Sequence, residues 1–133
     1  MYQLRGKLSI VMPAYNEEAL IYNSIMQTLS IVEQFAPDME IIAVNDGSKD
    51  KTKQEIERAI RDDAKQPHPV VPDMRVSGTR IKLVTSNKNR GKGNAIISGI
   101  SQAEGDYIAF VDADLELNPA QLEGYLKKMQ ESG

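Results

Sequence analysis

Two aspartates separated by one residue follow an apolar run near the end of the chain, and they carry the clearest chemistry in the sequence. The run at residues 108–111 is typical of a buried strand, and it leads directly into Asp112-Ala113-Asp114. Hard divalent cations such as Mg²⁺ and Mn²⁺ prefer oxygen ligands and commonly bridge to substrate phosphates. In open α/β sheets, ligands bind outside the carboxyl ends of the strands. The sequence therefore predicts a Mg²⁺ or Mn²⁺ site held by Asp112 and Asp114.

Three further polar or glycine-rich segments are expected to reach the same place. They follow the other apolar runs and lie at residues 13–18, 45–50 and 87–94. In a parallel sheet the segments that follow the strands line one edge, so these four segments converge in space. Arg90-Gly91-Lys92-Gly93 opens a predicted helix, where free backbone N–H groups and cationic side chains favour anions.

This combination suits a nucleoside diphosphate. The aspartate pair would hold a metal that neutralises the phosphates, and Lys92 can serve as a point charge on a phosphate. Asp46 could accept hydrogen bonds from a base or a ribose. Tyr15 could pack against a ring.

The elements that must position these segments alternate between strand and helix. Strands are predicted at residues 8–12 (ended by Pro13), 40–44, 81–85 and 106–111, and helices at 17–35, 50–64, 91–103 and from Asn118-Pro119 onward. Apolar residues at helical spacing support the helices: Leu20, Ile21, Ile25, Leu29, Val32 and Phe35 in the first, Ile56, Ala59 and Ile60 in the second, Ile96, Ile100 and Ala103 on one side of the third, and Leu122, Tyr125, Leu126 and Met129 as the inner stripe of the fourth. Residues 66–80 hold three prolines and no periodicity, which predicts a surface loop. The fold class is therefore predicted to be α/β, with a mostly parallel sheet of about four strands flanked by helices.

Composition places the chain among single globular domains and excludes several classes. A length of 133 residues suits one domain with one core. The formal net charge of −3 argues against nucleic acid as a partner, which would need a basic face. The absence of cysteine excludes disulfides and thiolate metal sites, and no apolar run approaches the roughly 20 residues of a membrane span.

Several other phosphate and metal motifs do not fit. No G-x-x-x-x-G-K-[ST] segment occurs, which excludes a P-loop. Gly91-Lys92-Gly93 lacks the third glycine of a dinucleotide fingerprint and does not follow the first strand. Leu117 occupies the position that a calcium-binding EF-hand loop reserves for glycine.

Structural interpretations of single residues stay open beside the functional ones. Asp46-Gly47-Ser48 also fits a tight turn and helix cap, and Asp50 fits a capping residue. Gly91 and Gly93 could instead permit close packing of a helix on the sheet. Tyr15 could be a loop anchor. The pair Asp112 and Asp114 favours function, because two neighbouring carboxylates repel unless something compensates.

Taken together and in order, the motifs resemble those of the family 2 glycosyltransferases with the GT-A fold. The matching pieces are Val11-Met12-Pro13-Ala14-Tyr15-Asn16-Glu17-Glu18, Val44-Asn45-Asp46-Gly47-Ser48-Lys49-Asp50-Lys51-Thr52, Asn89-Arg90-Gly91-Lys92-Gly93-Asn94-Ala95 and Val111-Asp112-Ala113-Asp114. They are most similar to those of dolichyl-phosphate glucosyltransferases and polyprenyl-phosphate mannose synthases. The resemblance implies a Rossmann-like nucleotide-binding half, and transfer of a hexose from UDP-glucose or GDP-mannose to a lipid phosphate with inversion at the anomeric carbon.

The resemblance also implies roles for individual residues. Pro13, Ala14, Tyr15 and Glu17 would line the nucleotide pocket, Asp46 would contact the base, Lys92 would lie near the phosphates, and Asp112, Ala113 and Asp114 would form the D-x-D motif. Asp114 is favoured as the direct metal ligand. No catalytic residue is assigned, because the general base of many members lies beyond the point where this chain ends. The alternatives are a nucleotidyltransferase and a non-catalytic nucleotide-binding or assembly module.

Two departures from the family pattern shape the remaining expectations. Asn45 stands where many relatives carry Asp. The chain also stops at Gly133, so residues 1–133 are expected to be a single truncated family domain, with little activity alone and a cytoplasmic location; membrane association of the full-length protein is left open. The fourth strand would then have a bare edge, which a second copy could cover in a homo-oligomer.

Overall fold

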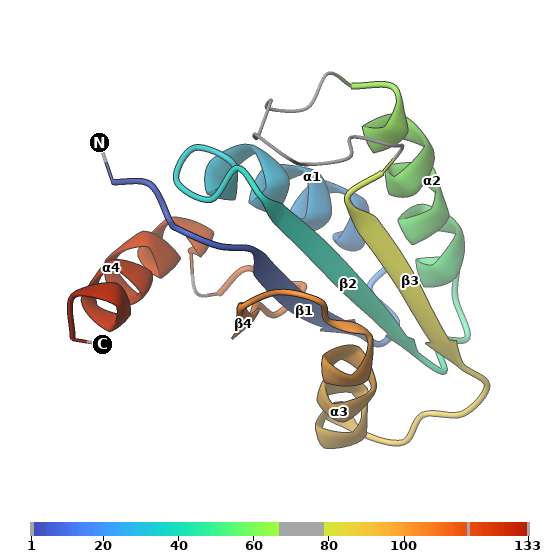
Figure 1. Ribbon diagram of the computed structural model, residues 1–133. Coiled ribbons are helices and arrows are strands. Elements are labelled where there is room, and N and C mark those ends of the chain that lie inside the picture. The colour runs from blue at the N-terminus through green and yellow to red at the C-terminus, as the bar shows by residue number, and fades with distance from the viewer. Residues whose placement is uncertain (1, 67–78, 117, 133) are drawn as a thin grey trace.

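The computed structural model describes residues 2–66, 79–116 and 118–132, and in this part of the chain strands and helices alternate (Figure 1). The elements are β1 Leu8–Ala14, α1 Ile21–Val32, β2 Met39–Asp46, α2 Thr52–Ala64, β3 Ile81–Ser86, α3 Lys92–Gln102, β4 Tyr107–Phe110, a short 3₁₀ turn η1 Pro119–Gln121, and α4 Leu122–Ser132. The strands form one parallel sheet in the order β3-β2-β1-β4. The predicted α/β class and strand number are confirmed. Most of the loop predicted at residues 66–80 lies outside the described residues.

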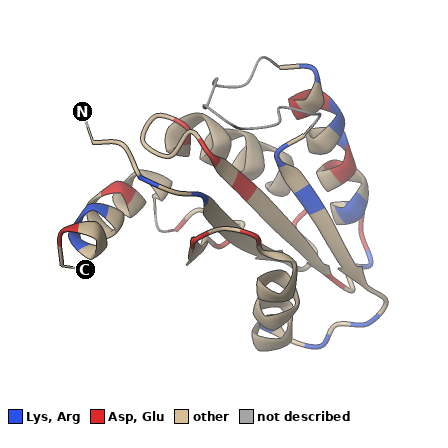
Figure 2. Ribbon diagram, in the orientation of Figure 1, with Lys and Arg blue, Asp and Glu red and all other residues tan. Residues whose placement is uncertain are grey.

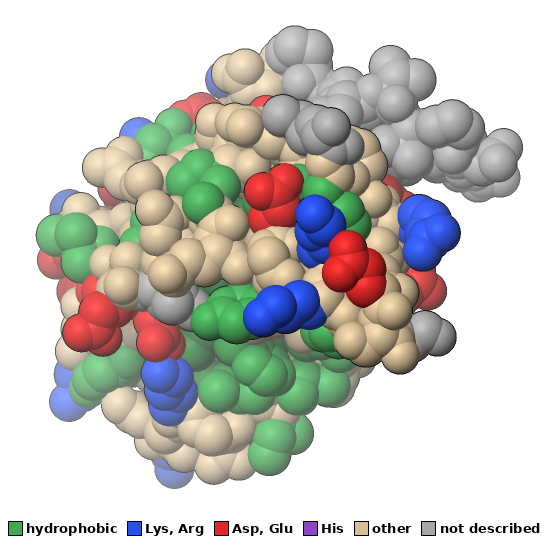
Figure 3. Space-filling model, turned by 90° about the vertical axis from the view of Figure 1, so that its left-hand side faces the viewer, with side chains coloured by type: hydrophobic (Ala, Val, Ile, Leu, Met, Phe, Trp, Pro, Cys, Tyr) green, Lys and Arg blue, Asp and Glu red, His purple; other side chains and the backbone are tan. Residues whose placement is uncertain are grey.

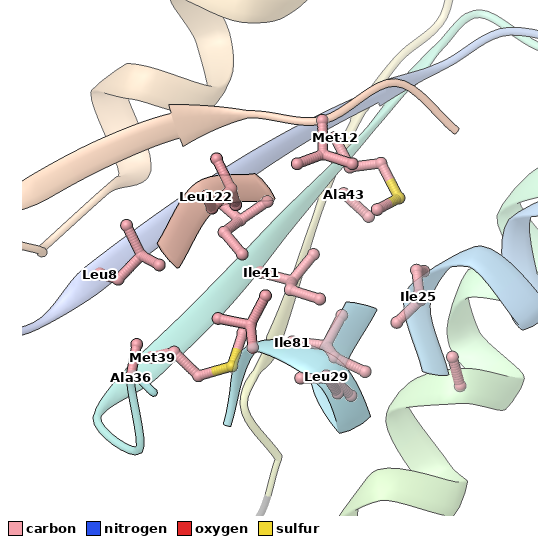
Figure 4. Close-up of a cluster of buried hydrophobic side chains, with 14 of the residues drawn as sticks. Leu8, Met12, Ile25, Leu29, Ala36, Met39, Ile41, Ala43, Ile81 and Leu122 are labelled. Atoms are coloured by element: carbon pink, nitrogen blue, oxygen red, sulfur yellow. The ribbon is translucent and has the colours of Figure 1, made fainter. Parts of the chain in front are cut away.

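The core lies on both faces of the sheet because β1 and β2 occupy its centre. Helices α1 and α2 cover one face and α3 covers the other (Figure 1). On the first face, apolar side chains from β1, β2 and α1 interdigitate, as Figure 4 shows for Met12, Ile41 and Ile25. On the second face, Val11, Ile42 and Val44 pack against Ala95 of α3. Both central strands are therefore buried along nearly their whole length.

Helix α3 contacts the sheet through its smallest residues rather than through its isoleucines. The buried positions of α3 are Ala95 and Gly99, whereas Ile100 is 40% exposed. A Cβ atom at Gly99 would lie 2.4 Å from Cγ1 of Val11, so glycine is required for this close approach. Of the predicted stripe of Ile96, Ile100 and Ala103, Ala103 packs against the cluster on this face, whereas Ile100 is exposed.

Both central strands run further than predicted. Strand β1 continues through Pro13 to Ala14. Proline is tolerated at this position because β4 stops opposite Val11, so that the end of β1 is paired only with β2. Strand β2 includes Asn45 and Asp46, which were predicted to begin a turn. The extra residues carry the strand ends into the region where the four polar segments meet.

Three predicted burial patterns are wrong, two because an element lacks a covering neighbour and one because a helix begins later than predicted. Strand β4 was predicted to be buried, but it is an edge strand whose Ile108 and Phe110 are 42% and 47% exposed. Leu20 precedes α1 and is exposed, since that helix begins at Ile21. Tyr125 and Met129 of α4 are also exposed, because only Leu122 and Leu126 reach the core. In the described residues, no helix is long and apolar enough to cross a membrane.

A buried carboxylate fixes the point at which the chain enters β4. Glu40 accepts hydrogen bonds from the hydroxyl of Ser9 (2.6 Å) and the backbone N–H of Glu104 (2.8 Å), and it pairs with Lys82 (3.0 Å). Burial alone would raise the pKa of Glu40, but these hydrogen bonds and the charge of Lys7 lower it below the ordinary value. The connection from α3 to β4 is thereby held against β1 and β2.

The role of Gly99 leads to a stability prediction. Gly99→Ala should lower the free energy of unfolding by about 1–2 kcal/mol, because Val11 is fully buried and β-branched and cannot move aside. Gly124→Ala is the matched control, since a Cβ there meets nothing within 4 Å and alanine is the better helix former by up to about 1 kcal/mol. Urea denaturation of both variants measures the difference, and equal stabilisation by the two alanines would contradict the close packing of α3.

Candidate functional site

A cleft of about 430 Å³ opens at the carboxyl ends of β1, β2 and β4, beside the N-terminus of α3. It brings together every residue that the sequence predicted for the site: Pro13, Ala14, Tyr15, Glu17, Asp46, Lys92, Asp112, Ala113 and Asp114. These residues come from four segments that are far apart in the chain. Parallel pairing of the strands places them side by side, as the position of the polar segments predicted.

Four further residues line the cleft and were not assigned to it from the sequence. They are Asn89, Gly91, Ala95 and Glu116. Asn89 and Gly91 belong to a segment that was expected to reach the site, and Glu116 continues the alternation of carboxylates after Asp114. Ala95 ends one of the pieces that carry the family resemblance but was given no role, and it lies at the cleft because α3 packs closely on the sheet.

The D-x-D motif is a turn whose middle residue is anchored in the core. Ala113 is buried, and its carbonyl accepts a hydrogen bond from the hydroxyl of Ser24 in α1. The flanking Asp112 and Asp114 are exposed at the cleft. Leu115 adopts a positive φ of 52°, and its N–H donates to the carbonyl of Asp112. A helix on the far side of β1 thus holds the backbone that presents both carboxylates.

Asp46 is a clamp between two of the converging segments. Its two carboxylate oxygens accept hydrogen bonds from the backbone N–H groups of Arg90 (2.9 Å) and Gly91 (3.0 Å), and the residue is buried. The neighbouring Gly47 has a φ of +67°, and a Cβ there would lie 2.3 Å from the backbone of Lys88 and Asn89. Asp46 therefore positions the loop before α3 while one edge of it lines the cleft.

Gly91 sets the direction in which α3 begins. It is the N-cap residue, with φ +94° and ψ 159°, a conformation that favours glycine. A Cβ at Gly91 or Gly93 would meet nothing within 4 Å, so close packing on the sheet does not explain either glycine. The first turn of α3, with its backbone N–H groups, opens at the cleft, and the loop before it is basic (blue in Figure 2).

The segment after β1 is fastened to the segment after β2. The backbone N–H of Asn16 donates to the Ser48 hydroxyl (2.9 Å), and its side-chain oxygen accepts from the N–H of Lys49 (2.9 Å). Asp50 precedes Lys51, the N-cap of α2, and accepts from the N–H groups of Thr52, the first residue of that helix (2.9 Å), and of Glu18 (3.2 Å). With the backbone held in this way, Tyr15 remains 41% exposed at the rim.

The electrostatics of the cleft are dominated by carboxylates. Five acidic residues line it, namely Glu17, Asp46, Asp112, Asp114 and Glu116, against Lys92 as the one basic residue in that lining. Burial, together with the charges of Asp114 and Asp50, raises the pKa of Glu17 above its ordinary value. A hydrogen bond to Asp112, at 2.6 Å, and the charges of Asp114 and Glu116 raise the pKa of Lys92. The acidic side chains of the lining therefore outnumber the basic ones, and a cation bound there would favour the entry of an anion.

The residues present fit a divalent cation that shares its coordination with a ligand. Oxygen atoms of Asp112 and Asp114 are the donors that Mg²⁺ and Mn²⁺ prefer. In the described residues no group of three or more His, Cys, Asp or Glu side chains is placed to hold a metal. Mg²⁺ is commonly bound by one or two carboxylates together with substrate phosphates and water. The site thus suits a metal–phosphate complex better than a bare metal ion.

The chain is similar in sequence to proteins named as transferases. It is 34% identical over 125 residues to an undecaprenyl-phosphate 4-deoxy-4-formamido-L-arabinose transferase of Enterobacter sp. (strain 638), which covers 94% of this chain and 34% of the relative. It is also 34% identical, over 94% of its length, to an uncharacterized glycosyltransferase of Synechocystis sp.. The chain spans about a third of the length of these relatives.

Solved structures share the fold. A mannosyltransferase from Pyrobaculum calidifontis, in complex with GDP-Man and Mn²⁺, superposes with a TM-score of 0.72 at 24% identity, over 92% of this chain and 32% of that protein. Residues 1–349 of Staphylococcus aureus TarS, in complex with UDP, give a TM-score of 0.65 at 25% identity, over 94% of this chain and 32% of that protein. The chain therefore has the fold of the corresponding third of these proteins, which is part of a GT-A fold.

The clamp made by Asp46 generates a prediction for this site. Asp46→Asn should lower the free energy of unfolding by about 1–3 kcal/mol, because an amide N–H₂ would face one of the two backbone donors and leave it unsatisfied. The control is Asp106→Asn at the opposite end of the sheet, where one exposed carboxylate oxygen accepts from the N–H of Lys7 (2.8 Å). Urea denaturation should show the larger loss for Asp46→Asn; a smaller loss than that of the control would contradict the clamp.

A sequence profile of "Glycosyl transferase family 2" matches residues 9–133 and so covers nearly the whole chain. The matched span includes all four segments that form the cleft. The chain therefore belongs to glycosyl transferase family 2.

Proposed function

We propose that this chain is the donor-binding part of an inverting, metal-dependent glycosyltransferase that transfers a hexose from a nucleotide sugar to a polyprenyl phosphate. The observation that carries the proposal is the acidic cleft at the carboxyl ends of β1, β2 and β4, with the D-x-D carboxylates on one side and the N-terminus of α3 on the other. An acidic pocket of this kind binds a diphosphate only through a cation. A helix N-terminus and a lysine supply the remaining positive potential.

Different residues of the cleft would bind the nucleoside, the metal and the phosphates of the donor. The wall on which a nucleoside would lie is formed by Pro13, Ala14 and Tyr15, and Asp46 lines the same cleft beside them. Asp112 and Asp114 would hold Mg²⁺ or Mn²⁺, which when bound stabilises the negative charge of the leaving diphosphate. Lys92 and the first turn of α3 would contact the same phosphates from the opposite side.

The acceptor class is proposed from the chemistry of the relatives. The Enterobacter relative is named as a transferase to undecaprenyl phosphate. A phosphate oxygen is already largely ionised at neutral pH, so this acceptor places little demand on a general base. The proposed donor is UDP-glucose or GDP-mannose, the two nucleotide sugars that the family resemblance implies. A dolichyl phosphate as the acceptor stays a prediction.

The direct test is binding of nucleotides by calorimetry with Mn²⁺ or with chelator. UDP-glucose or GDP-mannose should bind in the presence of Mn²⁺, and Asp114→Ala should weaken that binding by about tenfold or more through loss of a metal ligand. Glu131→Ala, which removes an exposed carboxylate from α4, is the control and should bind as the wild type does. Metal-independent binding, or equal binding by Asp114→Ala, would refute the assigned role. Binding without turnover in the full-length protein would favour the non-catalytic alternative.

We also propose that the exposed side of β4 is an interface between two copies of the chain. Parallel register places Ile108 and Phe110 on the same face as Ser9 and Val11, which is the face that carries α3. Helix α3 covers β1 and β2 and exposes its own Ile97 and Ile100. Figure 3 shows hydrophobic side chains gathered on the side of the molecule that includes β4. An edge strand with unpaired backbone groups beside such a surface favours association.

Analytical ultracentrifugation tests this interface. The wild type should sediment as a dimer at micromolar concentration, and Phe110→Lys should shift it to monomer by placing a charge in the apolar contact. Tyr125→Lys, on the exposed side of α4, is the control and should leave the dimer unchanged. A wild type that is monomeric at all concentrations would exclude the interface.

A further inference from the structure

The side chain of Lys92 does not point to an open phosphate site but is already bound. Its Nζ lies 2.6 Å from Oδ1 of Asp112, the first carboxylate of the D-x-D motif. Both partners are accessible to solvent, with 61% of the Lys92 side chain and 46% of the Asp112 side chain exposed. Exposed pairs of this kind add little to stability, so the pair can exchange partners at small cost.

Lys92 is also the first residue of α3, and its position connects the two halves of the cleft. Its backbone belongs to the helix N-terminus, where a phosphate is favoured, while its ammonium group reaches the carboxylates where a metal is favoured. The flexible four-carbon stem of a lysine allows the ammonium group to serve either side. A divalent cation on Asp112 would meet this positive charge at close range.

The charge balance of the residues that line the cleft requires such a group. Of the five acidic residues in the lining, only Asp46 has both carboxylate oxygens engaged by backbone N–H groups. Asp112, Asp114, Glu116 and Glu17 leave a concentration of negative charge that Lys92 alone offsets among the residues that line the cleft. Lys92 therefore supplies positive charge beside Asp112, where a bound metal ion would supply it.

We propose that Lys92 is the resident counter-ion of the D-x-D motif: it holds a free divalent cation out of the cleft and transfers to the diphosphate when metal and nucleotide arrive together. This inference rests on the proposed function and adds to it that metal and nucleotide bind cooperatively. Metal and nucleotide then bind cooperatively, because the diphosphate withdraws Lys92 from Asp112 and the vacated carboxylate accepts the metal. Neither ligand alone completes this exchange.

The test compares binding of Mn²⁺ alone with binding of nucleotide plus Mn²⁺. Free Mn²⁺ is measured by its electron paramagnetic resonance signal, and UDP and GDP are titrated by calorimetry at saturating Mn²⁺. Lys92→Gln should bind Mn²⁺ alone about 3- to 10-fold more tightly, because a positive charge near the metal is removed. The same variant should bind the nucleotide chosen by the wild type about tenfold more weakly, because the phosphate loses a cation.

Two control variants separate this role from simpler ones. Lys92→Arg keeps the charge and should retain the low affinity for Mn²⁺ alone. Lys88→Gln removes an exposed charge from the same loop outside the cleft lining and should change neither affinity. Thermal unfolding should show that Lys92→Gln remains folded, since the lost pair is exposed.

The opposite changes in the two affinities are the diagnostic result. Equal, weaker or undetectable Mn²⁺ binding by Lys92→Gln, compared with the wild type, overturns the counter-ion role. Tighter Mn²⁺ binding with unchanged nucleotide binding overturns the transfer to the diphosphate. If the wild type binds neither UDP nor GDP, the proposed function fails, while the titration with Mn²⁺ alone still decides whether Lys92 excludes the metal.

Discussion

Strand β1 hydrogen-bonds to β2 along one side and to β4 along the other, and the place of every residue in the cleft follows from this double pairing. The register aligns Ala14 with Asn45 and Val11 with Phe110, so the segments that follow all three strands emerge at one edge. The shorter β4 ends opposite Val11, three residues before the end of β1, and this leaves room for the D-x-D turn beside Pro13 and Ala14. A sheet with β1 at its edge would have separated the carboxylates from the wall of the cleft.

The cleft is lined by side chains of both charges, with five acidic residues and Lys92. In the proposed function, the carboxylates would attract the cation that a diphosphate needs, and the N-terminus of α3 would supply positive potential for the phosphate itself. Both carboxylate oxygens of Asp46 accept hydrogen bonds from the backbone of the loop before α3. Asp46 therefore positions that loop, and its negative charge is compensated by the two N–H groups. The ion pair of Lys92 with Asp112 joins the two halves. Geometry and charge compensation therefore depend on the same few contacts.

Three glycines show how the fold brings these parts close together. Gly47 lets the turn after β2 touch the backbone of residues 88 and 89, and Gly91 turns the chain into α3 with a positive φ. Gly99 acts two turns later and lets the helix lie directly on Val11 and Val44. The first two glycines serve the conformation of the backbone, and the third serves packing. Together they set the distance between the helix N-terminus and the D-x-D carboxylates.

Local patterns in the chain were sufficient to predict the α/β class, the order of its elements and the convergence of four polar segments, because hydrophobic periodicity and turn chemistry act over a few residues. The ends of β1 and β2, the contact face of α3 and the exposure of Ile108, Phe110, Tyr125 and Met129 became visible only in the folded chain. Each of these depends on which neighbour covers a surface, and a helix or strand pattern does not encode its neighbour. The same holds for the bonds of Asp46 to Arg90 and Gly91 and of Lys92 to Asp112, whose partners are distant in sequence and meet only through the pairing of the strands.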